Sequence, residues 1–116
     1  MNVCAFTGNL GEDPESIFTD DGTQIVNFSL AIRSTKNKTV WIKVVCFNKT
    51  AELAEKHLHK GARVGVSAML DQDKWETPDG HKRSVHKLIA NRLEFIKTDG
   101  RGFEDGAERD PDDIPF

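Results

Sequence analysis

The chain of 116 residues contains no apolar run of the length that a membrane-spanning helix requires. Its hydrophobic fraction is 37% and its mean hydropathy is −0.52, values typical of a soluble protein with a polar portion. The first residues, Met1 to Cys4, also lack the basic and apolar regions of a secretory signal peptide. The sequence therefore predicts a cytoplasmic protein with no membrane partner, and its length predicts one domain with a modest core.

Cysteine is scarce, with two residues in the whole chain. Cys4 and Cys46 each lie in a stretch rich in strand-forming residues. Because disulfides are rare in the cytosol, both are expected to be reduced thiols within strands rather than partners in a disulfide.

The residue patterns of catalytic and metal sites are missing as well. No Ser/His/Asp or Cys/His arrangement stands out, and no glycine-rich phosphate loop precedes a helix. His57 and His59 are two positions apart on a predicted helix and so point in different directions, and no cysteine or carboxylate set completes a zinc spacing. The sequence therefore predicts no catalytic residue, no metal site and no cofactor.

The net charge of −3 hides an uneven distribution. Residues 98–116 hold seven acidic residues and two arginines, whereas residues 1–97 hold 14 basic and 12 acidic residues. A neutral-to-basic body with an acidic tail indicates two different kinds of partner. The acidic overall composition therefore does not exclude binding of nucleic acid by the body.

Apolar residues that recur at every second position predict five strands, at 2–10, 24–33, 40–47, 63–75 and 82–96. Gly8, Gly11 and Asp13-Pro14 are expected to break or bend the first strand, and turns are expected at 20–22, 34–39 and 78–80. One helix is predicted at 50–59, with Gly61 at its C′ position and one apolar face formed by Ala51, Ala54 and Leu58.

Three strands, one helix and two further strands are the order of elements in an OB-fold barrel. A doubly wound α/β fold would instead need strands and helices to alternate. We therefore predict an all-β fold with one helix, a five-stranded OB-fold barrel, in residues 1–97. After Lys97 the chain loses periodicity, so 98–111 are expected to form a flexible, disordered acidic linker and 112–116 a separate docking tip.

The predicted strand at 40–47 carries the sharpest functional signal in the folded part of the chain. Successive side chains of a strand point to opposite faces, so one face here is entirely apolar and suits a core. A soluble strand that buries one face usually has polar residues on the other. This strand instead places two aromatic residues and a cation on its other face, which consists of Trp41, Lys43, Val45 and Phe47.

Trp41 and Phe47 are about 20 Å apart at ~3.3 Å per residue, so each can stack a different base of one nucleic-acid strand. Lys43 lies between them for a phosphate contact, and Lys74-Trp75 is expected to form a second aromatic–cation pair. Aromatic residues also mark protein interfaces, so a subunit contact at Trp41 stays open as the alternative. The other candidate phosphate contacts are Arg33, Lys49, Lys60, Arg83 and Lys87.

The last five residues are Asp112-Asp113-Ile114-Pro115-Phe116. A disordered acidic tail normally ends in polar residues, whereas this one ends in an aromatic residue. Phe116 can fill an apolar pocket of a partner while its carboxylate and the aspartates meet Arg or Lys. We therefore predict that 112–116 is a docking peptide for a partner protein.

Several short motifs of this sequence, taken together in their order along the chain, resemble those of the bacterial-type single-stranded DNA-binding proteins of bacteria, their phages and plasmids. Each motif is weak alone, and together they are highly specific. The resemblance covers residues 2–96 and the last five. The residues that carry it are Gly8-Asn9-Leu10-Gly11 with Asp13-Pro14, Trp41 with Val44-Val45 and Phe47, Leu58-x-Lys60-Gly61, Lys74-Trp75 and the 112–116 tip.

The resemblance implies a protein that wraps single-stranded DNA, usually as a homotetramer, and is nucleoid-associated when bound to DNA. It implies that the acidic tip recruits replication, recombination and repair enzymes. It also implies that the stacking residues are Trp41, Phe47 and Trp75, and that the backbone contacts are Lys43, Lys49, Lys60 and Lys74.

Three departures from the family pattern matter. A tryptophan common near the second-strand hairpin is replaced around Lys36, and Asp71 and Asp73 occupy positions that are often basic. Ile42 stands where many members have a histidine near a subunit contact. The linker of about 14 residues reaches only roughly 20 Å, which suggests a phage, plasmid or accessory variant.

The sequence thus predicts a non-enzymatic, sequence-tolerant single-stranded DNA-binding protein with a partner-recruiting tail. The alternative is an OB-fold adaptor in a replication or repair assembly with little DNA affinity of its own. The departures near Lys36, Asp71 and Asp73 motivate that alternative.

Overall fold

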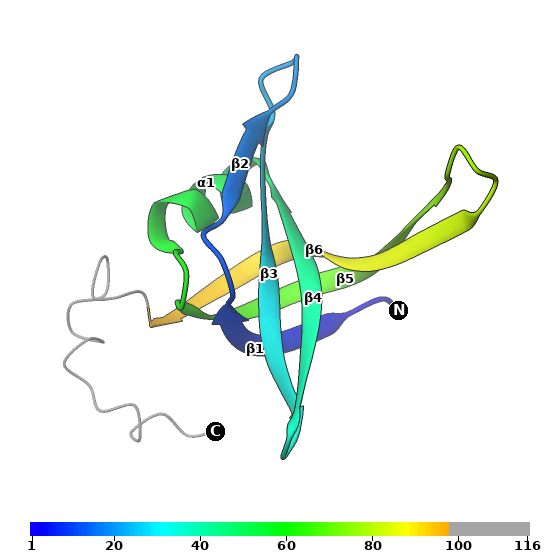
Figure 1. Ribbon diagram of the computed structural model, residues 1–116. Helices are drawn as coiled ribbons and strands as arrows, with labels where there is room; N and C mark the ends of the chain where they lie inside the picture. Colours follow the sequence, from blue (N-terminus) through cyan, green and yellow to red (C-terminus); the bar gives the residue numbers. More distant parts are fainter. Residues whose placement is uncertain (98–116) are drawn as a thin grey trace.

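The computed structural model describes residues 1–97, which form seven elements (Figure 1). The predicted linker at 98–111 and the predicted tip at 112–116 lie outside the described residues. The elements are β1 (Cys4–Leu10), β2 (Glu15–Phe18), β3 (Gln24–Thr35), β4 (Lys38–Phe47), α1 (Asn48–His57), β5 (Arg63–Glu76) and β6 (Lys82–Lys97).

The strands form one sheet in the order β1-β5-β6-β4-β3-β2, and β1 also pairs with β3. This additional pairing closes five of the strands into a barrel, with β2 continuing along β3. All neighbours are antiparallel except β4 and β6. With α1 placed between β4 and β5 in the chain, the predicted five-stranded OB fold is confirmed.

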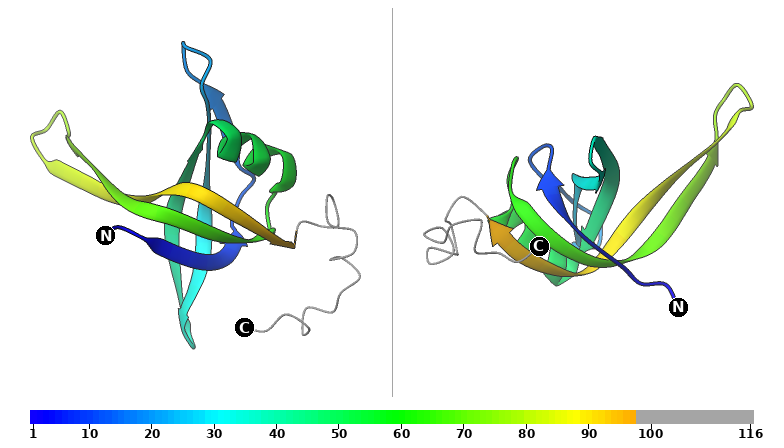
Figure 2. Two further views of the ribbon diagram at one scale, coloured as in Figure 1. Left: turned by 180° about the vertical axis from the view of Figure 1, so that it is seen from behind. Right: turned by 90° about the horizontal axis from the view of Figure 1, so that it is seen from below.

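The β5–β6 hairpin extends well beyond the barrel (Figures 1 and 2). Its two strands are the longest in the sheet, with 14 and 16 residues. Figures 1 and 2 show it projecting on the opposite side of the barrel from α1. The outer part of this arm is exposed on both of its faces.

The first predicted strand forms β1, which runs unbroken through Gly8, so that glycine does not break it. The chain leaves the strand after Leu10 and bends at Gly11 and Asp13-Pro14, as those residues indicated. The sequence prediction missed β2, the short strand that follows the bend. Most of β2 is exposed, so its sequence shows no clear alternation. Pairing with β3 defines it instead, in a register that runs from Glu15 opposite Asn27 to Phe18 opposite Gln24.

The core lies inside the barrel and is made of every second residue of the strands together with the apolar face of α1. Both cysteines are free thiols, as predicted, and burial raises the pKa of the Cys46 thiol to about 12. The largest fully buried side chains of the core are Leu30, Leu88, Val26, Val44, Val64 and Cys46.

The predicted helix end is wrong. α1 begins at Asn48 and ends at His57, so Gly61 is not its C′ residue. Leu58 takes an extended conformation and its backbone N–H donates to the carbonyl of Ala54 at 2.9 Å. The turn that follows is closed by the Ala62 N–H, which donates to the His59 carbonyl at 2.9 Å, and Gly61 takes its positive φ of 88° within this turn.

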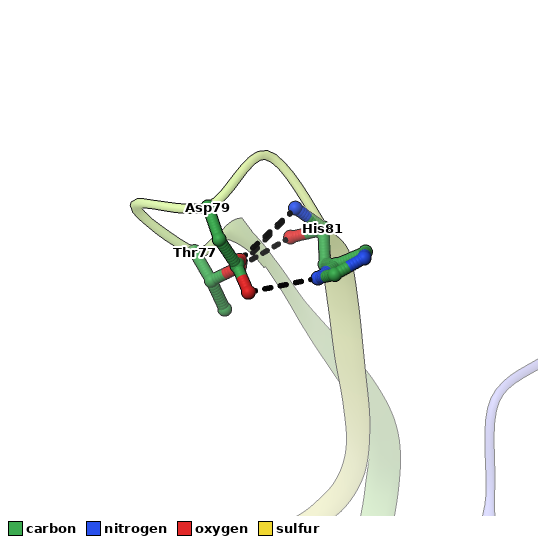
Figure 3. Close-up of polar contacts among 3 residues, drawn as sticks. All are labelled: Thr77, Asp79 and His81. Atoms are coloured by element: carbon green, nitrogen blue, oxygen red, sulfur yellow. Dashed lines mark hydrogen bonds and ion pairs between the residues drawn. The ribbon is translucent and has the colours of Figure 1, made fainter.

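The hairpins β2–β3 and β5–β6 end in the same kind of turn, at 19–23 and 77–81. In each, the backbone N–H of the first threonine donates to the carbonyl of the fifth residue, at 2.9 and 2.8 Å. Figure 3 shows the second turn, where Asp79 accepts from the Thr77 hydroxyl and pairs with His81. The Thr77 hydrogen bond, followed by those from His81, lowers the pKa of the Asp79 carboxyl. These contacts fix the tip of the projecting arm.

Leu88→Ala should lower the free energy of unfolding by about 2–5 kcal/mol, because Leu88 is fully buried and its loss leaves a cavity. Leu70→Ala is the matched control, since Leu70 is opposite Leu88 in the β5–β6 register but is 43% exposed. Chemical denaturation should show a loss of less than about 1 kcal/mol for that control. Equal losses in the two variants would contradict the described core.

Candidate nucleic-acid interface

The outward face of β4 is arranged as its sequence pattern indicated. Val44 and Cys46 are buried in the barrel, whereas Trp41 is 59% and Phe47 37% exposed. Lys43 is also exposed. Val45, on the same outward face, is nevertheless buried and does not belong to the core cluster.

The strand register explains why Val45 is buried. It also shows that the outward face of β4 continues onto the neighbouring strands. Residues opposite each other on paired strands share a face. Val45 therefore lies between Asn27 of β3 and Ile89 of β6, both half-buried. In the next row, Lys43 lies between Ser29 of β3 and Lys87 of β6.

The same register carries the face from β6 onto β5 and along the projecting arm. Lys87 is opposite Asp71, and Arg83 is opposite Trp75. Trp75 is 50% exposed. We call this surface the aromatic face and define it by Trp41, Lys43, Phe47, Trp75, Arg83 and Lys87.

The pairing of Trp75 with Lys74, expected from their adjacency in the sequence, is wrong. Neighbouring residues of a strand point to opposite faces, so Lys74 lies with its partner Ser84 on the side away from Trp75. The cation opposite Trp75 is Arg83. Residues from both sides of the arm line a shallow depression near its end, namely Lys74, Trp75, Glu76, Lys82, Arg83 and Ser84.

The other predicted phosphate contacts divide into two groups. Arg33 is exposed and lies two residues beyond Ala31, the partner of Trp41, so it extends the aromatic face at that end. Lys49 and Lys60 lie off the sheet, in the first turn of α1 and in the loop after it. The backbone N–H of Lys60 donates to the Asp13 carboxylate at 2.7 Å, which ties this loop to the bend after β1.

Trp41 rests on Gly11, a contact that the sequence did not reveal. A Cβ at Gly11 would lie 2.5 Å from Cζ3 and 2.8 Å from Cη2 of the indole. The backbone N–H of Gly11 is held by the Ser29 carbonyl at 3.2 Å, so the glycine cannot simply move aside. One side of the Trp41 ring is therefore supported by backbone while much of the ring stays exposed.

One ion pair lies on the aromatic face. Lys87 Nζ is 2.7 Å from Asp73 Oδ2, and the Lys87 side chain is 19% exposed. The sequence prediction had treated Asp71 and Asp73 alike, as charges that weaken affinity. The structure separates them, because among residues 1–97 only Asp73 pairs with Lys87.

Ile42, the departure that bears on assembly, packs partly buried against the core of its own chain. The ring centroids of His57 and Phe95 are 5.0 Å apart, so this histidine is part of the packing around α1. Within residues 1–97 no group of three or more His, Cys, Asp or Glu side chains is placed to hold a metal ion. The same part of the chain has no helix long and apolar enough to cross a membrane.

Gly11→Ala should displace the Trp41 ring, because the added Cβ would overlap the indole. We expect an altered tryptophan fluorescence spectrum with a barrel that still unfolds cooperatively. Gly65→Ala is a control, since its Cβ would come no closer than 3.4 Å to a neighbour. An unchanged spectrum for Gly11→Ala would contradict the described contact between Gly11 and the Trp41 ring.

Comparison with known proteins agrees with the fold and with the motifs. The model of the single-strand binding protein family matches residues 1–96. The chain is 32% identical to the single-stranded DNA-binding protein of Xylella fastidiosa over 94% of its own length and 73% of that protein. It is 33% identical to those of Xanthomonas campestris and Xanthomonas axonopodis over 88% of its length, covering 64% and 61% of them. The chain belongs to the single-strand binding protein family.

Proposed function

We propose that this protein binds single-stranded DNA along the aromatic face, with little preference for base sequence. The observation that carries the proposal is the placement of three exposed aromatic side chains, Trp41, Phe47 and Trp75, on one face with cations between them. Family membership and the names of the relatives support the choice of ligand.

Each aromatic ring would stack one base, a contact worth about 1–3 kcal/mol that every base can make. Lys43 and Arg83, with Arg33 at one end, would meet phosphates between the stacked bases. None of these contacts reads the donor and acceptor pattern of a base edge, so the interaction would tolerate any sequence. We propose Lys49, Lys60 and Lys74 as further phosphate contacts. They would meet the parts of the DNA strand that extend beyond the aromatic face.

We propose that the protein works as a homo-oligomer, a tetramer by analogy with the family, and is not an enzyme. Residues 1–97 would form the DNA-binding domain and 98–111 a linker. Residues 112–116 would recruit replication, recombination and repair enzymes. The protein would be located in the cytoplasm and would associate with the nucleoid when bound to DNA.

The second candidate is an adaptor with weak DNA affinity, and one observation favours it. Asp71 and Asp73 lie on the same face as the stacking residues and would repel phosphates. The aromatic residues would then contact a protein partner. Substitution of the rings separates the two candidates.

Titration with oligo(dT) at low salt should quench tryptophan fluorescence. Trp41→Ala and Phe47→Ala should each weaken binding about 5- to 150-fold through loss of one stacked base. Phe18→Ala is the matched control, because Phe18 is a 66% exposed aromatic whose partner, Gln24, puts it on the other face of β2–β3. Full affinity in both Trp41→Ala and Phe47→Ala would favour the adaptor.

Phe116→Ala should abolish binding to the replication and repair enzymes that dock on the tip, measured by pull-down with purified enzymes. Affinity for oligo(dT) should stay the same, because Phe116→Ala leaves every acidic charge of the tail in place. Phe103→Ala, an aromatic substitution in the linker, should leave the pull-down unchanged. Enzyme binding that survives Phe116→Ala would rule out docking through this residue.

A further inference from the structure

The three cations that define the aromatic face are not equivalent. Among residues 1–97, Lys43 and Arg83 form no ion pair, whereas Lys87 is held 2.7 Å from Asp73. The Lys87 side chain is 19% exposed and the Asp73 side chain 52% exposed. The cation is therefore the more enclosed partner of the pair.

Lys87 occupies the middle of the face. It is next to Lys43 on β4 and opposite Asp71 on β5, so it lies between the strand that carries Trp41 and Phe47 and the strand that carries Trp75. Any strand of DNA that runs from one set of rings to the other passes this position. A phosphate there would meet Lys87 only together with Asp73.

The choice between the two aspartates follows from the register. Asp71 is directly opposite Lys87, whereas Asp73 is opposite Val85, one diagonal step toward the end of the arm. Lysine is long enough to reach a diagonal neighbour on the same face. Pairing with Asp73 draws the ammonium group along the arm, away from the like charge of Lys43.

We propose that Asp73 competes with DNA phosphate for Lys87 and so lowers both the affinity for single-stranded DNA and its dependence on salt. The inference rests on the proposed function. When a phosphate takes Lys87, the freed carboxylate remains beside the DNA and retains a cation. The net release of cations is then smaller than for a contact with an unpaired lysine. Stacking would therefore supply a larger share of the affinity at this point of the face.

The test measures affinity for oligo(dT) over a series of NaCl concentrations. Asp73→Asn should bind about twofold to fivefold more tightly at low salt, the range that an exposed ion pair is worth. The plot of log affinity against log salt should steepen by about 0.7, the value for one phosphate contact on a single strand. Asp71→Asn is the matched control, because it removes the same charge from the same strand and face without breaking the ion pair.

Substitutions of the lysines supply a second, independent comparison. In the otherwise unchanged protein Lys43→Met should weaken binding more than Lys87→Met, since Lys87 is already occupied. In the Asp73→Asn background the two losses should become equal. Asn has the shape of Asp and the site is half-exposed, so thermal unfolding of Asp73→Asn should match that of the unchanged protein.

Equal effects of Asp73→Asn and Asp71→Asn on affinity and slope would overturn the role of Asp73. So would a gain from Asp73→Asn that persists when Lys87 is replaced by methionine. Absence of oligo(dT) binding by the unchanged protein at every salt concentration would overturn the proposed function itself, and the two failures are thereby distinguished.

Discussion

Closure of the barrel depends on how closely β1 approaches β3. The two strands pair only at Asn9–Ala31 and Leu10–Leu30, and a Cβ at Gly8 would lie 2.3 Å from the Ala31 carbonyl oxygen. A side chain at this position would therefore push β1 away from β3. Leu10 and Leu30, both buried, pack where the strands meet. Hydrophobic burial supplies the driving force, and the absence of one Cβ permits the geometry that uses it.

The position of Trp41 on the aromatic face depends on this closure of the barrel. The bend after β1 brings Gly11 under Trp41, and the Ser29 carbonyl of β3 holds Gly11 in place. Trp41 is thus supported by the residue that directly follows β1, which is hydrogen-bonded to β3. Under the proposed function, a ring supported in this way would lose little further freedom when a base stacks on it, which would favour binding. On the same face, the proposed competition of Asp73 for Lys87 would act in the opposite direction and weaken binding.

The fold and the candidate site were predictable from the sequence to different degrees. Alternation of apolar residues gave the long strands, and aromatic residues on the polar side of β4 pointed to the site. β2 was missed because its pairing with β3, rather than its own residues, makes it a strand. The helix end was misplaced because Gly61, with a φ of 88°, belongs to the turn that follows the helix and not to its C′ position. Arg83 opposite Trp75, the support under Trp41 and the Asp73–Lys87 pair all depend on register or on contacts between distant segments, which no local pattern contains.

We propose that one strand of DNA contacts the aromatic face from β4 to the projecting arm. The chain has two tryptophans, one at each part of this face, so incorporation of 5-fluorotryptophan gives two ¹⁹F resonances. Trp41→Phe and Trp75→Phe assign them. We predict that both resonances shift when oligo(dT) is added and that both return when salt releases it. A bound state in which either resonance stays at its free position would contradict contact of one DNA strand with both parts of the aromatic face.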